Sequence, residues 1–235
     1  MPYFPDHQAL FIHIPKCAGK SIEAAMLPPG LDGTAGKRPL LNRAARMLEK
    51  ATHSQIPARY LLGTYDVALA AQHLTYAEIE LLGLLPREVL DNALKFAVVR
   101  HPYGRAISSV MHFRHRFADR YRLSERPDRA EVERAIAAWL EIEPPDHNVR
   151  AHRRRQVDYL RGPDGTMRVE RILRLESLKE DFASLCADLS LPAAALPWVD
   201  RSGSKRDRNE LLTARSRQMV REAFAADFDI LQYAP

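Results

Sequence analysis

The stretch ALFIHIPKCAGKS (residues 9–21) decides the fold of this protein. Residues 9–14 form an apolar run that ends at Pro15, which is typical of a buried strand. Residues 20–27 read as a helix, which Pro28 ends. A short loop of small residues joins the two. A strand, a tight loop and a helix in this order predict the start of an α/β domain.

The loop over residues 14–21 contains groups that bind an oxyanion. Backbone N–H groups in such a loop and at a helix start converge on one point. Lys16 and Lys20 add positive charge, Ser21 adds a hydroxyl, and Gly19 lets the backbone approach a ligand closely. The sequence therefore predicts a loop that binds the phosphate of a nucleotide-like ligand. An ordinary strand-to-helix turn with solvated lysines is the alternative.

Two well-known phosphate loops do not fit this stretch. The nucleoside-triphosphate loop, GxxxxGK[ST], requires glycine at position 14, which is Ile14 here. A phosphatase loop with a nucleophilic cysteine would place an arginine six residues after Cys17, and that position is Glu23. A phosphate loop at this position is therefore of another kind.

A second segment, FAVVRHPYGRAISSVMHF (96–113), has the same strand-to-helix order. Residues 95–100 form the clearest strand, and a helix follows from Pro102. Arg100 stands at the C-terminal end of the strand, where ligands of open α/β sheets bind. With Ser108 on the following helix, it suits a second phosphate. An arginine in a structural ion-pair network is the alternative.

Helices and strands alternate along the rest of the chain. This alternation predicts an α/β fold with a mainly parallel sheet. The further helices are predicted over residues 40–50, 75–82, 128–141, 149–161, 177–189 and 209–228, the further strands over 67–73 and 168–176, a turn over 162–165 and a loop over 190–209.

Length and composition set wider limits. A chain of 235 residues with 46% hydrophobic residues predicts a single domain over 1–235. The net charge of +5 suits an anionic ligand but is too small and too spread out to indicate nucleic acid. Two cysteines far apart indicate a reducing compartment, and no stretch resembles a signal peptide or a membrane span. A soluble, cytoplasmic protein is expected.

Taken together, His13–Ser21 and Val98–Ser108 resemble the sulfotransferases that use 3′-phosphoadenosine 5′-phosphosulfate (PAPS). The nearest likeness is to the carbohydrate-type branch (sulfotransferase family 2-like), whose loops read like HIPKxAGTS and VVRxPxxRxxS. Lys20 departs from the Thr or Ser usual there. Looser likenesses over 72–79, 154–182 and 200–233 extend the resemblance to most of the chain, whereas residues 28–65 match nothing.

The resemblance implies a P-loop-like three-layer fold and transfer of a sulfuryl group from PAPS to a hydroxyl of a carbohydrate or glycoconjugate. Adenosine 3′,5′-bisphosphate (PAP) would be the product, and no metal is needed. Lys16 would lie against the bridging oxygen of the phosphosulfate. The 5′-phosphate would be held by the loop residues Lys16, Cys17, Ala18, Gly19, Lys20 and Ser21, and the 3′-phosphate by Arg100 and Ser108.

A hydroxyl acceptor benefits from a general base, for which an imidazole is well suited. His73 is the candidate, because it follows an apolar run and related branches place a catalytic histidine in such a segment. A histidine that caps the next helix is the alternative. Glu23 competes as the base, but we expect it to be a surface helix residue. His13 is expected to support the loop from behind.

Other functions and contacts remain open at this point. A P-loop-like kinase for small molecules or nucleosides is one alternative, although Ile14 and the lack of a clear Mg²⁺-binding aspartate count against it. A non-catalytic binder of adenosine bisphosphate is another, although the presence of Lys16 and His73 counts against it. Arg153–Arg155 would be a solvated helix face or a contact for an anionic acceptor.

Overall fold

The computed structural model of the chain describes residues 3–4, 7–26, 73–145, 147–191, 196 and 208–235. Contacts group the chain into two compact units, each described by itself below: Met1–Val99 with Asp158–Asp200, and Arg100–Val157 with Arg201–Pro235. The single domain over 1–235 stays a prediction. The predicted helix over 40–50, nearly all of the strand over 67–73 and most of the loop over 190–209 lie outside the described residues.

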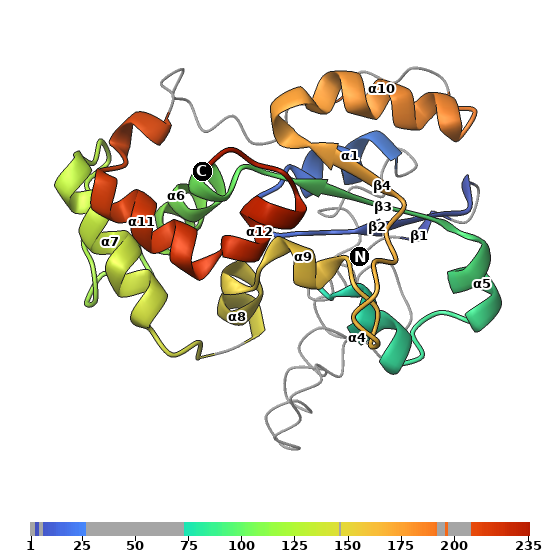
Figure 1. Cartoon of the computed structure of the whole chain (residues 1–235), viewed down its shortest axis with the longest axis horizontal. Coiled ribbons are helices and arrows are strands. Elements are labelled where there is room, and N and C mark those ends of the chain that lie inside the picture. The colour runs from blue at the N-terminus through green and yellow to red at the C-terminus, as the bar shows by residue number, and fades with distance from the viewer. Residues whose placement is uncertain (1–2, 5–6, 27–72, 146, 192–195, 197–207) are drawn as a thin grey trace, which may run out of the picture. The chain divides into compact units, whose positions relative to one another are not determined.

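A four-stranded sheet forms the centre of the first unit (Figure 1). β1 pairs antiparallel with β2, whereas β2, β3 and β4 are parallel neighbours. The predicted mainly parallel sheet is thus confirmed, and the two-residue strand β1 is an addition that the sequence did not indicate. In sheet order the strands are β1 (Tyr3–Phe4), β2 (Ala9–Ile12), β3 (Leu94–Val99) and β4 (Arg171–Arg174).

The two central strands are buried along their length. All four residues of β2 and the last five of β3 are buried, as expected of parallel strands that are covered on both faces. Phe11 and Phe96 are register partners, and their rings stack with centroids 5.0 Å apart. The chain leaves β2 and β3 at the same edge of the sheet, and both predicted phosphate segments begin there.

Helices cover both faces of this sheet, which completes the predicted three-layer arrangement. Figure 1 shows α1 and α10 above the sheet and α4 below it. The predicted helices over 20–27, 75–82 and 177–189 are confirmed, and α5 is an addition. Their bounds are Gly19–Met26 for α1, Tyr76–Leu81 for α4, Arg87–Asn92 for α5 and Leu178–Asp188 for α10.

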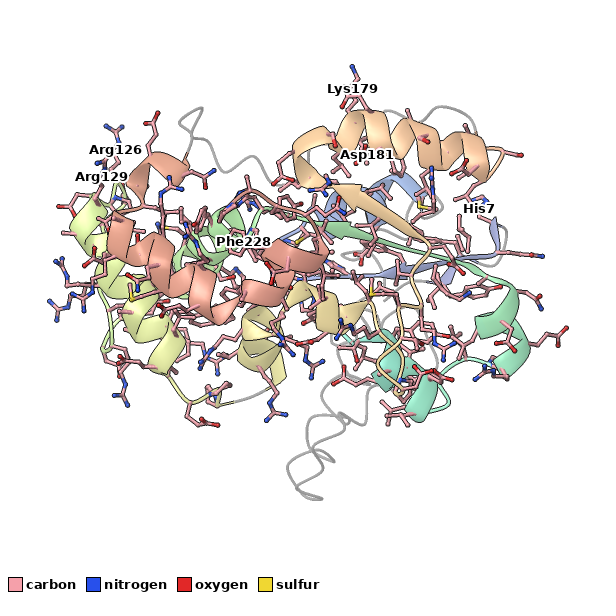
Figure 2. The ribbon with its side chains drawn as sticks, viewed as in Figure 1. His7, Arg126, Arg129, Lys179, Asp181 and Phe228 are labelled. Carbon is pink, nitrogen blue, oxygen red and sulfur yellow. The ribbon has the colours of Figure 1, made fainter. Side chains whose placement is uncertain are left out.

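The strand predicted over 168–176 is shorter in the structure, because β4 gives way to a 3₁₀ turn, η4 (Leu175–Ser177). Asp181, labelled in Figure 2, accepts hydrogen bonds from the Arg174 N–H at 2.7 Å and the Ser177 hydroxyl at 3.0 Å. These bonds turn the chain from the strand into α10. The turn predicted over 162–165 is confirmed.

The described part of the second unit is helical. α6, α7 and α11 pack against one another. Trp139 of α7 is almost fully buried, and its ring stacks on Phe113 of α6 with centroids 5.0 Å apart. No helix in the described part of the chain is long and apolar enough to cross a membrane. The bounds are Pro102–Phe113 for α6, Arg129–Glu141 for α7, His147–Arg153 for α8, Ala214–Ala223 for α11 and Ala225–Ile230 for α12.

The single helix predicted over 149–161 is wrong, because the chain breaks between α8 and α9 (Gln156–Tyr159). Before the break, the Arg153 guanidinium donates to the carbonyls of Leu140 and Ile142 at the end of α7. Arg153 therefore caps a helix, which differs from both roles expected for the run Arg153–Arg155. After the break, the Asp227 carboxylate accepts the N–H groups of the first two residues of α9.

The single helix predicted over 209–228 is also wrong. The chain forms a 3₁₀ turn, η5 (Arg208–Leu211), and then the two helices α11 and α12. Thr213 begins α11 with a capping box shared with Ser216, and Phe224 separates the two helices. The second break allows Asp227 to face α9.

Candidate active site

The loop after β2 has an unusual backbone. Lys16 and Ala18 have φ angles of 68° and 59°, in the left-handed region, which costs about 1–3 kcal/mol for each residue that is not glycine. Left-handed residues at alternate positions are typical of a backbone nest that binds anions. The Ser21 N–H donates to the Ala18 carbonyl at 2.9 Å, so α1 begins directly at the end of this loop. The strained backbone and the helix start fit the phosphate loop predicted for residues 14–21.

Gly19 lies against the imidazole of His13. A Cβ atom at position 19 would lie 1.9 Å from the Nε2 atom of His13, so only glycine fits there. The ring of His13 is buried and stacks on Phe11, with centroids 5.4 Å apart. His13 therefore supports the loop from behind, as predicted, and glycine at position 19 is required by the packing of this ring.

Glu23 holds the ring of His13 in place. The Glu23 Oε1 atom lies 2.8 Å from His13 Nδ1, and both residues are only 4% exposed. The expectation that Glu23 is a surface residue is wrong. The face of α1 that includes Ile22 and Met26 turns inward, and His13 gives the buried carboxylate a partner.

The pair is held as a carboxylate and a neutral imidazole. Burial lowers the pKa of His13 below its usual range, although the bond to Glu23 works in the opposite direction. Burial tends to raise the pKa of Glu23, but the hydrogen bond with His13 outweighs this effect, and the pKa of Glu23 is lowered. The neutral ring of His13 thus donates its Nδ1 proton to Glu23.

Acid is expected to destabilise the protein through His13. The pKa of His13 in the folded protein lies below the usual 6.5. As the pH falls below 6.5, the unfolded chain therefore binds a proton at His13 before the folded chain does. The neutral ring of His13 contributes its full share of the stability above pH 6.5. This share is lost as the pH falls through the pKa that His13 has in the folded protein. Urea unfolding over this range should show a free energy of unfolding that falls more steeply for the wild type than for His13→Gln, by up to about 1.4 kcal/mol per pH unit. Parallel curves would contradict this expectation.

Gly19→Ala is expected to lower the free energy of unfolding by about 1–3 kcal/mol, because the new methyl group and the ring of His13 overlap. His13→Ala removes the ring and with it the overlap. The double variant should therefore lose less stability than the sum of the two single variants, as measured by chemical denaturation. Additive losses would show that the two residues do not contact each other.

His73 is attached to this loop. Its Nδ1 atom lies 3.2 Å from the His13 carbonyl oxygen, and its ring meets the His13 ring edge-on with centroids 4.9 Å apart. A bond to a carbonyl requires the proton on Nδ1, which makes Nε2 the basic nitrogen of the neutral ring. The residue that caps α4 is Thr75, which forms a capping box with Glu78, so His73 does not have the capping role considered above.

The loop side chains differ in exposure. Lys16 and Ser21 are half-buried, and Lys20 is exposed. Cys17 is buried, with its Sγ atom 3.5 Å from the Pro15 carbonyl oxygen, so its side chain points into the protein. Cys17 can therefore meet a ligand at this loop only through its backbone.

In the second unit, Arg100 lies over the first turn of α6. A Cβ atom at Gly104 would lie 2.9 Å from the Arg100 Nε atom and 3.4 Å from Cζ. The absence of a side chain at Gly104 thus leaves room for the guanidinium. Ser108 is four residues further along the helix, on the same face as Gly104, and is half-buried. The guanidinium of Arg100 and the side chain of Ser108 therefore lie along one face of α6, and their role in binding a phosphate stays a prediction.

Three residues of this region were missed by the sequence reasoning or given no function. Gly104 lies in the first turn of a helix, where glycine is unfavourable. A glycine at such a position could have indicated that another group packs closely against the helix. Gln156 is fully buried and bonded to the backbone of Arg100, and Asp227 is fully buried and bonded to the backbone of Gln156. No local pattern marks the last two, because their partners are distant in sequence.

Comparison with known proteins decides the family. A family model with the description "Sulfotransferase family" matches residues 2–234, nearly the whole chain. The chain belongs to the sulfotransferase family. This sulfotransferase therefore has sulfuryl transfer as its general activity, and both candidate phosphate segments lie within the matched residues. No curated protein and no solved structure gives a significant match to it.

Proposed function

We propose that this sulfotransferase transfers a sulfuryl group from PAPS to a hydroxyl of a carbohydrate or glycoconjugate, with Lys16 and His73 as its catalytic residues. The observation that carries the proposal is the bond between His73 and the His13 carbonyl. Although 60 positions separate them in the chain, this bond attaches the candidate base to the loop that bears Lys16. Family membership supports PAPS as the sulfuryl donor.

Lys16 stabilises the charge that develops on the leaving group. In a loose transfer of this kind, the protein mainly positions the partners and stabilises charge on the departing oxygen. The left-handed backbone at Lys16 and Ala18 supports binding of the 5′-phosphate by the loop N–H groups. Because Lys16 belongs to the same loop, we assign its ammonium to the bridging oxygen between phosphorus and sulfur.

His73 takes the proton of the acceptor hydroxyl. With Nδ1 bonded to a carbonyl oxygen, the ring has a defined tautomer and orientation, and Nε2 can accept a proton. Glu23 is a weaker candidate for the base, since its carboxylate is buried and bonded to His13.

The 3′-phosphate is assigned to Arg100 and Ser108. A guanidinium can bind a phosphate through two parallel hydrogen bonds, and the hydroxyl adds a third. The space over Gly104 supports this assignment within the second unit. The assignment of both phosphates to one ligand rests on the family match.

Calorimetric titration tests the nucleotide class. We expect PAP to bind without a metal ion and ATP–Mg²⁺ to bind at least about tenfold more weakly, because only PAP has a separate 3′-phosphate. Tight binding of ATP–Mg²⁺ with no binding of PAP would overturn the proposal and favour the kinase alternative.

A screen of hydroxyl acceptors with ³⁵S-labelled PAPS tests the chemistry. We expect transfer of the label to a carbohydrate or glycoconjugate, and non-carbohydrate alcohols and amines serve as comparison acceptors. Binding of PAP without transfer to any of the acceptors would favour the non-catalytic binder. Transfer only to amines or non-carbohydrate alcohols would overturn the acceptor class and keep the donor.

A further inference from the structure

Arg100 follows the last residue of β3, at a point where a strand usually loses its hydrogen-bond partners. Both of its backbone groups are nevertheless bonded, and both bonds go to one side chain. The Arg100 N–H donates to the Gln156 Oε1 atom at 2.8 Å, and the Gln156 Nε2 atom donates to the Arg100 carbonyl at 2.8 Å. A primary amide supplies both a donor and an acceptor, so Gln156 replaces a neighbouring strand at this one residue.

Gln156 is itself held by the C-terminal part of the chain. The two Asp227 carboxylate oxygens accept the N–H groups of Gln156 at 2.9 Å and of Val157 at 3.0 Å. Gln156 and Asp227 are both 0% exposed, so these bonds are made away from water, where the loss of one partner is costly. Asp227, Gln156 and the half-buried Arg100 are thus joined by consecutive hydrogen bonds within the second unit.

A second contact from the C-terminal segment reaches the next residue. The His101 Nε2 atom lies 3.0 Å from the Ala234 carbonyl oxygen, and the His101 ring packs against Tyr233 with centroids 5.1 Å apart. The backbone of Arg100 and the side chain of His101 are therefore held by contacts from far along the chain, just before the turn of α6 that receives the guanidinium of Arg100.

We propose that Gln156 and Asp227 are positioning residues for the 3′-phosphate: they fix the backbone of Arg100 so that its guanidinium lies over Gly104, on the Ser108 side of α6. This inference rests on the proposed function, since it takes Arg100 to be the group that binds the 3′-phosphate. Neither positioning residue touches the ligand. Their effect is confined to the part of the affinity that comes from the 3′-phosphate.

The test compares two nucleotides that differ only in that group. Calorimetry gives the Kd of PAP and the Kd of adenosine 5′-monophosphate. The Kd of the monophosphate divided by the Kd of PAP measures the contribution of the 3′-phosphate to binding. A charge-assisted site should make the ratio about 10- to 100-fold in the wild type. Gln156→Met keeps the volume and removes both bonds to Arg100. We expect it to lower the ratio by up to about tenfold, toward a value of one, with the Kd of the monophosphate unchanged.

Tyr121→Phe is the matched control. Tyr121 is buried in the same unit, and its hydroxyl donates to the Val110 carbonyl at 3.1 Å, so this variant also loses a buried bond to the backbone. It should lower the melting temperature without changing the ratio. A Gln156→Met protein that is destabilised like this control and keeps the wild-type ratio would overturn the inference.

Two further variants test the same inference if Gln156→Met does not fold. Gln156→Glu still accepts from the Arg100 N–H but sets a second acceptor against the Arg100 carbonyl, and Asp227→Asn sets an amide donor against a backbone N–H. Each should lower the ratio less than Gln156→Met, and wild-type ratios in both would overturn the inference. A wild-type ratio near one would instead refute the 3′-phosphate assignment, and with it the proposed function.

Discussion

Lys16→Ala is expected to lower kcat for sulfuryl transfer by about 10²–10³-fold, the usual effect of removing one group that stabilises a developing oxyanion. Because Lys16 has a φ of 68°, alanine meets the same left-handed backbone that lysine does, and the substitution isolates the loss of the ammonium. The measurement is kcat with labelled PAPS and the acceptor found in the screen, together with the melting temperature of the variant.

Lys179→Ala provides the comparison for this result. Lys179 is an exposed lysine near the start of α10 (Figure 2), and its loss removes the same charge from the same unit. It should leave kcat at the wild-type value. If Lys16→Ala changes only the KM for PAPS and leaves kcat intact, Lys16 binds the ground state and the transition state equally well, and the assigned role is wrong.

His73→Asn is expected to lower kcat by about 10²–10⁴-fold and to leave the Kd of PAP unchanged. An asparagine amide can still donate to the His13 carbonyl, so the variant keeps the contact that attaches residue 73 to the loop and loses only the basic nitrogen. Steady-state kinetics and calorimetry on the same preparation separate the two effects.

Thr75→Ala separates a catalytic effect at His73 from damage to α4. This variant removes the helix cap two residues away and should reduce stability by about 1 kcal/mol with kcat near the wild-type value. If His73→Asn and Thr75→Ala reduce kcat to the same extent, the loss at His73 reflects the helix and not a base. An unchanged kcat in His73→Asn would contradict the mechanism directly.

Much of the fold could be predicted because its signals are local. The apolar runs that became β2 and β3 end at Pro15 and before His101–Pro102, and the helices α4 and α7 begin directly after their capping residues, Thr75 and Asp128. The loop from residue 14 to residue 21 could be predicted for the same reason: a strand, small residues and a helix start are contiguous in sequence. The family resemblance drew on these same stretches, and the family match confirms it.

The break within 209–228 had a local signal that was not used, the capping box that Thr213 forms with Ser216. The other errors share a physical cause. The break within 149–161 lies between two contacts with distant partners, Arg153 with the end of α7 and Asp227 with the start of α9. Glu23 was misplaced in the same way, because the buried imidazole that pairs with it belongs to the segment before the loop.

The sequence by itself determined which chemical groups are available at Ile14–Ser21 and around Arg100, since residue type and order along a strand, loop and helix are local properties. Only the tertiary structure decided how those groups are held. It set the ring of His13 against Gly19, the Nδ1 atom of His73 on the His13 carbonyl, and the amide of Gln156 on both backbone groups of Arg100. The reason is physical: a buried polar group needs a partner, and the chain can supply that partner from any distance once it is folded.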